Sequence, residues 1–240
     1  MADDLIEHFE RIKWARWQTG ILNRWVKYFE RSKPYELRYK PDEIGWMTEV
    51  WAHATQEKHS PIQIQAGVII HELRSTLDAL VCSLAWRNNK DPGTSTYFPI
   101  CHEKQAFYER AAKGKIRLIS DTDKALIESL EPWSGGNDWL YSLHKADNIR
   151  KHQRLLLTGS LSQGVGFFAS TGWGIGDLVP GTGNLADGVL VLKAEIVNHL
   201  KIDVNVKVCF SEPAFISGKQ LVPVINKFAD TVQSILEIFS

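Results

Sequence analysis

Two short stretches of the chain, residues 70–78 and 144–152, place ionisable side chains at helical spacing among apolar residues. In the first stretch, His71, Arg74 and Asp78 follow one another at intervals of three and four, so they lie on one face of a helix. Arg74 and Asp78 can therefore form an ion pair along that helix. A guanidinium held in this way offers several donors in a fixed geometry, which suits it to bind a carboxylate or a phosphate.

The second stretch has the same arrangement. His144, Asp147, Asn148 and Lys151 share one helical face, and His152 lies beside them. Histidine titrates near neutral pH, so His152 and His144 are the candidates for a general base or acid. If the two faces meet between packed helices, they form a polar strip that binds a small anionic ligand. The ligand-binding residues that we expect are His71, Arg74, Asp78, Asp147, Asn148 and Lys151.

A second interpretation assigns the same residues a purely structural role. A buried network of Arg74, Asp78, Asp147 and Lys151 would hold two helices in register without any ligand. The sequence leaves both interpretations open, because it does not show whether the two faces meet. It also allows the polar strip to organise a homo-oligomer.

The order of several short motifs resembles a bacterial protein family with no assigned activity. Members of that family carry the strings N-L-R-S-A-L-D-H-L, F-P-I, Q-P-Y and N-x-D-K-H-R, in that order. The corresponding residues here are 73–80, 98–100, 130–133 and 148–152. The resemblance covers about residues 64 to 155 and implies a bacterial or phage protein, but it implies no reaction.

The chain departs from that family at four informative positions. Glu72 replaces the family's asparagine, Glu131 its glutamine, Arg150 its aspartate and Gln153 its arginine. If the family's aspartate belongs to a site, its replacement by Arg150 does not preserve the chemistry, because the charge is reversed.

A second resemblance is to the HEPN ribonucleases, small helical domains whose R-x4-6-H active site is shared across a dimer. Metal-independent RNA cleavage needs a base for the 2′-hydroxyl and a cation for the phosphate. By this resemblance His152 or His144 would be the base, and Arg74 and Lys151 would face the phosphate of RNA. The spacing of the motif is absent, since His144 precedes Arg150 and His152 follows it too closely.

The elements that must position these residues follow from the periodicity of the chain. Residues 3–32 and 221–239 predict two amphipathic helices, and alternating residues around Pro41-Asp42 predict a hairpin. On the first helix the expected core stripe is Leu5, Phe9, Ile12, Trp17, Ile21, Trp25 and Phe29. Further helices are expected over residues 62–88, 103–112, 121–130 and from 138 into the second polar stretch, and β-like runs over 166–168, 189–192 and 204–210.

This order of elements predicts an α+β fold. A helical half with a short N-terminal hairpin extends to about residue 155, and an antiparallel sheet occupies residues 156–220. The C-terminal helix 221–239 covers the sheet or returns to the helical half. No internal repeat or long linker divides residues 1–240, so we expect a single compact domain.

The composition excludes several classes of protein. Lys plus Arg equals Asp plus Glu at 28 each, so no global field attracts nucleic acid or an anionic membrane. Three widely spaced cysteines argue against a disulfide framework and a structural zinc site. No stretch approaches the roughly 18 apolar residues of a membrane helix, and the N-terminus lacks the pattern of a signal peptide, so we expect a cytoplasmic protein.

Taken with the two polar stretches, these properties predict a soluble binding or regulatory module without a cofactor or a metal ion. It would bind a small anionic ligand, or form a homo-oligomer, through the polar strip. The alternative is a metal-independent endoribonuclease. Neither stretch is a motif that specifies a reaction, so the sequence does not decide whether the protein is an enzyme.

Overall fold

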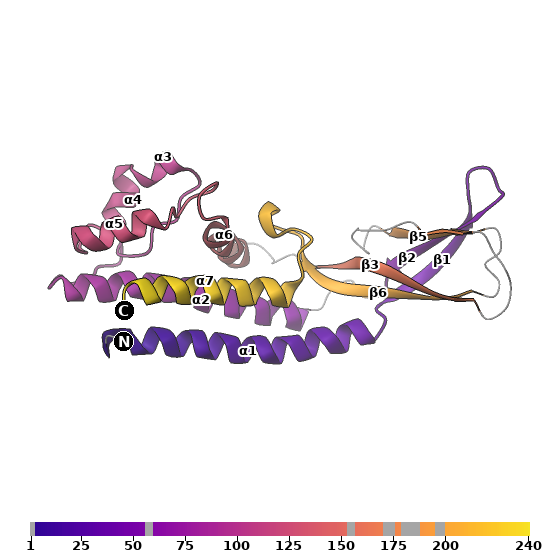
Figure 1. Ribbon diagram of the computed structural model, residues 1–240, viewed down its shortest axis with the longest axis horizontal. Helices are drawn as coiled ribbons and strands as arrows, with labels where there is room; N and C mark the ends of the chain where they lie inside the picture. Colours follow the sequence, from indigo (N-terminus) through magenta and orange to yellow (C-terminus); the bar gives the residue numbers. More distant parts are fainter. Residues whose placement is uncertain (1–2, 56–59, 153–156, 170–175, 179–187, 195–199) are drawn as a thin grey trace.

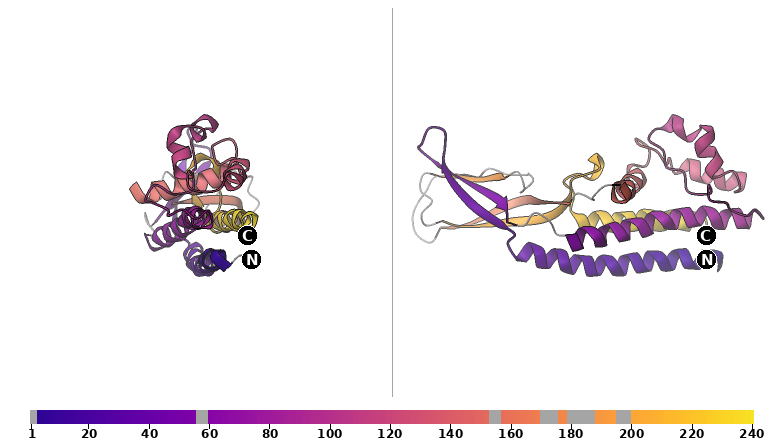
Figure 2. Two further views of the ribbon diagram at one scale, coloured as in Figure 1. Left: turned by 90° about the vertical axis from the view of Figure 1, so that its left-hand side faces the viewer. Right: turned by 180° about the vertical axis from the view of Figure 1, so that it is seen from behind.

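In this computed structural model, helices gather at one end of an elongated molecule and strands at the other (Figure 1). The structure describes residues 3–55, 60–152, 157–169, 176–178, 188–194 and 200–240. α1, α2 and α7 run side by side, α6 packs on α2 and α7, and α3 to α5 lie near the C-terminal end of α2 (Figures 1 and 2). These elements are η1 (Asp3–Leu5), α1 (Ile6–Arg31), α2 (Ser60–Arg87), α3 (Lys104–Phe107), α4 (Arg110–Lys115), α5 (Asp121–Ser129), α6 (Asp138–His152), η2 (Ala214–Ile216) and α7 (Leu221–Ile238).

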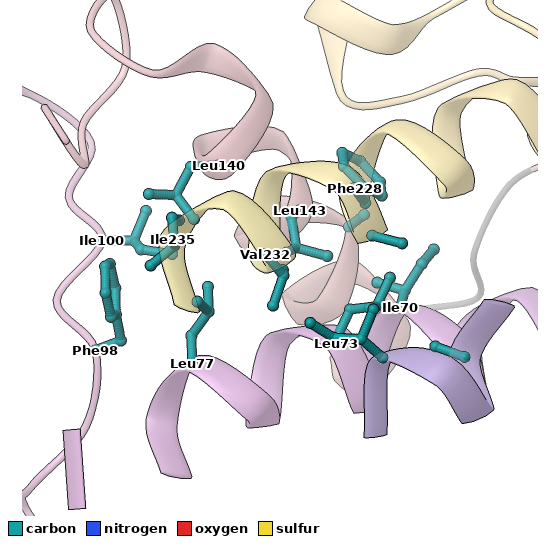
Figure 3. Close-up of a cluster of buried hydrophobic side chains, with 14 of the residues drawn as sticks. Ile70, Leu73, Leu77, Phe98, Ile100, Leu140, Leu143, Phe228, Val232 and Ile235 are labelled. Atoms are coloured by element: carbon teal, nitrogen blue, oxygen red, sulfur yellow. The ribbon is translucent and has the colours of Figure 1, made fainter. Parts of the chain in front are cut away.

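α2 is the central helix, because α1, α6 and α7 all pack against it. Its apolar residues are buried on several faces, and together with α6, α7 and the segment around Phe98 they form the main core. Burying one such leucine or phenylalanine side chain contributes about 1.5–3 kcal/mol. Figure 3 shows this core, with labels on Ile70, Leu73, Leu77, Phe98, Ile100, Leu140, Leu143, Phe228, Val232 and Ile235.

α1 contacts the bundle through a different face from the predicted one. Its buried residues recur at alternating steps of four and three, whereas Trp17 and Trp25 are 63% and 42% exposed. The predicted core stripe was therefore wrong at these two tryptophans. The buried residues of α1 are His8, Ile12, Ala15, Thr19, Leu22, Val26 and Phe29. The helix carries two apolar stripes, and the one with the small residues Ala15 and Thr19 allows its neighbours to approach closely.

The predicted starts of two helices are confirmed by their caps. The Ser120 hydroxyl accepts a hydrogen bond from the backbone N–H of Asp123, at 3.1 Å, where α5 begins. The Asn137 side-chain oxygen accepts one from the backbone N–H of Leu140, also at 3.1 Å, where α6 begins. Each cap satisfies a backbone donor that the first turn leaves without a partner.

All strand pairs that the structure describes are antiparallel. β1 and β2 form the predicted hairpin, β5 pairs with β2, and β4 pairs with β5, which gives the order β1-β2-β5-β4. β3 and β6 form a separate two-stranded sheet. The strands are β1 (Tyr35–Pro41), β2 (Thr48–Ala54), β3 (Leu157–Ala169), β4 (Gly176–Leu178), β5 (Val189–Ala194) and β6 (Leu200–Phe210).

The α+β class is as predicted, but one finer feature differs. The strands are interleaved in sequence, because the N-terminal hairpin joins β4 and β5 of the later β-rich segment. Of the two predicted positions of the C-terminal helix, α7 takes the second and returns to α1, α2 and α6, because its apolar stripe fits the helical core. The strands have a small core of their own, formed by Val50, Ala52, Val189, Val191, Leu192, Val204 and Val206.

Candidate functional site

The two predicted polar faces meet where α6 packs on α2. Nδ1 of His71 lies 2.9 Å from Oδ1 of Asp147, and Nε of Arg74 donates to Nδ1 of His144 at 3.3 Å. Sequence alone did not show this contact. We call the joined set the polar seam; its members are His71, Arg74, Asp78, His144, Asp147, Asn148, Arg150 and Lys151.

Arg74 is a structural centre of the polar seam. Its side chain is only 5% exposed, and each of its nitrogens has a partner. Nη1 pairs with Oδ1 of Asp78 at 2.6 Å, Nη2 donates to the carbonyl of Phe98 at 2.9 Å, and Nε binds His144. Oδ1 of Asp78 also accepts from the backbone N–H of Phe98 at 2.9 Å. The Arg74–Asp78 pair thus binds both backbone groups of one residue and anchors the segment around Phe98 to α2.

Asp147 is the fully buried carboxylate of the polar seam, and the side chains of His71, Arg150 and Lys151 surround it. A carboxylate only accepts, so His71 donates from Nδ1. Nζ of Lys151 lies 2.5 Å from Oδ2, and Nε of Arg150 lies 3.8 Å from Oδ1. A buried charge persists only with such partners. The His71 and Lys151 side chains are 42% and 41% exposed, so they connect Asp147 to the surface.

His144 has an environment that keeps it neutral. Burial lowers the pKa of His144 to about 4, and the neighbouring positive charge of Arg74 acts in the same direction. Both ring nitrogens of His144 have a neighbour in the polar seam, because Nε of Arg74 lies 3.3 Å from Nδ1 and Nδ2 of Asn148 lies 3.0 Å from Nε2. A general base needs an accessible lone pair and a pKa near the working pH. The environment of His144 therefore does not favour the ribonuclease alternative.

His152 was the other candidate base. It is the last residue of α6, and its side chain lies outside the described residues. The remaining predicted residues, Asp78, Asn148 and Lys151, are all within the polar seam, with Asp78 on the Arg74 side and Lys151 on the Asp147 side.

One residue of the polar seam, Arg150, was not among the predicted site residues, and neither was Gly67 beside it. Arg150 joins Asp147 at the i, i+3 spacing of one helical turn, a signal that the sequence does contain. Gly67 on α2 faces it, because a Cβ at this position would lie 2.6 Å from Cδ of Arg150. A glycine within an otherwise apolar helix was the sign of this close approach.

Comparison with known proteins does not assign this chain to a family. No protein-family model, curated protein or solved structure matches this chain. The motif resemblance over residues 64 to 155 therefore stays a prediction. Within the described ranges, no helix has both the length and the apolar composition that crossing a membrane requires.

Proposed function

We propose that the protein is a binding or regulatory module that holds a small anion at the exposed edge of its polar seam, between His71 and Lys151. One observation carries the proposal: a fully buried carboxylate, Asp147, gathers the side chains of His71, Arg150 and Lys151, and those of His71 and Lys151 remain about two-fifths exposed. Three permanent cations, Arg74, Arg150 and Lys151, face two carboxylates. One positive charge is therefore left over before the histidines are counted, and an anionic ligand neutralises it.

The seam residues divide into a frame and a ligand face. Arg74 binds Asp78, His144 and the carbonyl of Phe98, so all of its nitrogens are already occupied. His71 uses Nδ1 on Asp147, so Nε2 donates to a ligand oxygen only in the doubly protonated form of the ring. Lys151 has three donors and needs only one for Asp147. A phosphate or carboxylate oxygen is the acceptor that suits these two groups.

The test is thermal unfolding with inorganic phosphate, pyrophosphate or citrate added in separate titrations. A ligand that binds only the folded state raises Tm by mass action. We expect at least one of these anions to raise the Tm of the natural protein. Lys151→Ala should abolish that rise, and it should also lower the anion-free Tm, because it removes a partner of the buried Asp147. Lys145→Ala is the control, because Lys145 is an exposed lysine of the same helix outside the polar seam. If no anion raises Tm, the seam only holds helices together.

A further inference from the structure

α1 exposes a row of large aromatic side chains on the outside of the helical bundle. Trp17 and Tyr28 are 63% and 80% exposed, and Trp14 and Trp25 are 38% and 42% exposed. α1 lies at the edge of the bundle, with its neighbours α2 and α7 on one side (Figures 1 and 2). An exposed row of apolar residues of this size marks a surface for association.

Three residues of the row, Trp14, Trp17 and Tyr28, belong to a regular heptad pattern. From residue 7 to residue 31 one line of positions recurs strictly at alternating steps of three and four, which is the spacing of a coiled-coil contact line. We call this line the outer seam; it consists of Glu7, Glu10, Trp14, Trp17, Ile21, Arg24, Tyr28 and Arg31. It is separate from the buried line of α1, which also follows steps of four and three. α1 thus has two coiled-coil faces, and the bundle uses one.

The outer seam is complementary to itself when a second copy runs antiparallel. We place the two-fold axis midway between Trp17 and Ile21, level with residue 19 along the helix. Positions whose numbers sum to 38 then face each other, so each residue of the outer seam meets an outer-seam residue of the second copy. Trp17 then meets Ile21 of the second copy, and Trp14 meets its Arg24 in a cation–π arrangement. The two-fold axis repeats each of these contacts. The centre of the seam is therefore apolar and aromatic on both copies.

The ends of the outer seam carry opposite charges in the same register. Glu7 meets Arg31 of the second copy, and Glu10 meets its Tyr28 hydroxyl. A parallel pair would instead place Glu7 on Glu7 and Arg31 on Arg31, which repel. Within its own chain Glu7 pairs with Arg11 across an exposed turn of helix at 3.0 Å, a pair that contributes little and can exchange.

From this complementarity we infer that α1 is the dimer interface, and that a second copy of this chain docks antiparallel along the outer seam. Each β hairpin begins just beyond the C-terminal end of its own α1, so the strand regions of the dimer point to opposite ends (Figure 1). The inference does not depend on the proposed anion site, because the polar seam lies between α2 and α6.

The first test is sedimentation velocity across a range of protein concentrations. We expect the natural chain to sediment as a dimer, and Trp17→Glu to raise the dissociation constant by about 30-fold or more, as for the loss of a central aromatic contact. The matched control is Trp46→Glu, which changes a tryptophan that is 81% exposed at the tip of the β hairpin. Circular dichroism melting checks that both variants stay folded, since neither side chain is in the core.

The second test fixes the orientation by cysteine cross-linking. The double variant Glu10→Cys with Tyr28→Cys is expected to form a disulfide-linked dimer, because each new cysteine faces its counterpart on the second copy. Glu10→Cys alone is expected not to, since the two copies of residue 10 would lie about 27 Å apart at 1.5 Å per residue. A monomer at all concentrations, a Trp17→Glu variant that still dimerises, or cross-linking by Glu10→Cys alone would overturn the inference. If the protein is a monomer that binds RNA or lipid vesicles, the outer seam is a surface for that partner and not for a second copy.

Discussion

The side chain of Arg150 on α6 crosses α2 directly over Gly67. A Cβ at Gly67 would lie 2.6 Å from Cδ and 2.9 Å from Cγ of Arg150, closer than packed atoms allow. Glycine within a helix is about 0.5–1 kcal/mol less stable than alanine. Gly67 therefore lowers the stability of α2, but it leaves the space that the Arg150 side chain needs to approach the buried Asp147.

Gly67→Ala is expected to displace Arg150. Gly20→Ala is the matched control, because Gly20 is also within a helix and an added Cβ there meets nothing within 4 Å. The control should gain about 1 kcal/mol in the free energy of unfolding. Gly67→Ala should gain less, because it displaces Arg150, and it should also weaken the anion-dependent rise in Tm. Urea unfolding and the phosphate titration measure the two effects, and identical behaviour of both variants would refute this account of Gly67.

Arg74→Ala tests the frame of the polar seam. The substitution leaves the Phe98 carbonyl, the Asp78 carboxylate and Nδ1 of His144 without their partner. Removal of one member of a buried ion pair costs about 3–5 kcal/mol, and we expect the lower part of this range because Asp78 is 35% exposed. Arg74→Lys should recover little, since one ammonium cannot reach three partners in a plane. Arg117→Ala, at an exposed arginine, should stay within about 0.5 kcal/mol of the natural chain in urea unfolding.

The features that the sequence predicts well are those that depend on neighbouring residues. The caps Ser120 and Asn137 act within one turn, and the i, i+4 pair of Arg74 and Asp78 acts within one helix. These local interactions have a fixed spacing along the chain. The two faces of the polar seam could therefore be predicted from spacing, whereas their contact could not, because it depends on how α6 packs on α2.

The features that were missed depend on distant partners. α1 has two apolar stripes of similar strength, and only the packing of α2 and α7 decides that Trp17 is on the exposed one. β2 pairs with β5, although more than 130 residues separate Ala54 from Val189 along the chain. The sequence of a strand does not show which other strand it pairs with, so the sheet was predicted from the later strands alone.

Glu49 tests how the hairpin holds β5. It lies directly opposite Lys40 on β1 and Lys193 on β5, so the three side chains form one row across the sheet. The hydrogen bond from Lys193 lowers the pKa of Glu49 to about 2, with a further hydrogen bond from Trp51. Glu49→Gln should therefore speed amide hydrogen exchange in β5, while Glu36→Gln, whose partner Arg38 is on the same strand, should not. Equal exchange in both variants would show that the row does not hold the strand.

We expect the folded protein to lose stability in mild acid because of His144. Its folded pKa of about 4 lies below the ordinary value of 6.5, chiefly because of burial, so the unfolded chain binds a proton more readily than the folded one. The stabilisation is complete above about pH 6.5 and is lost as the pH falls from there toward 4, by at most about 3 kcal/mol. Urea unfolding between pH 7 and 4.5 should show this slope. His144→Gln should reduce the slope but not abolish it, because burial lowers the pKa of His8 as well. An unchanged slope in His144→Gln would mean that His144 is protonated as easily in the folded protein as in the unfolded chain.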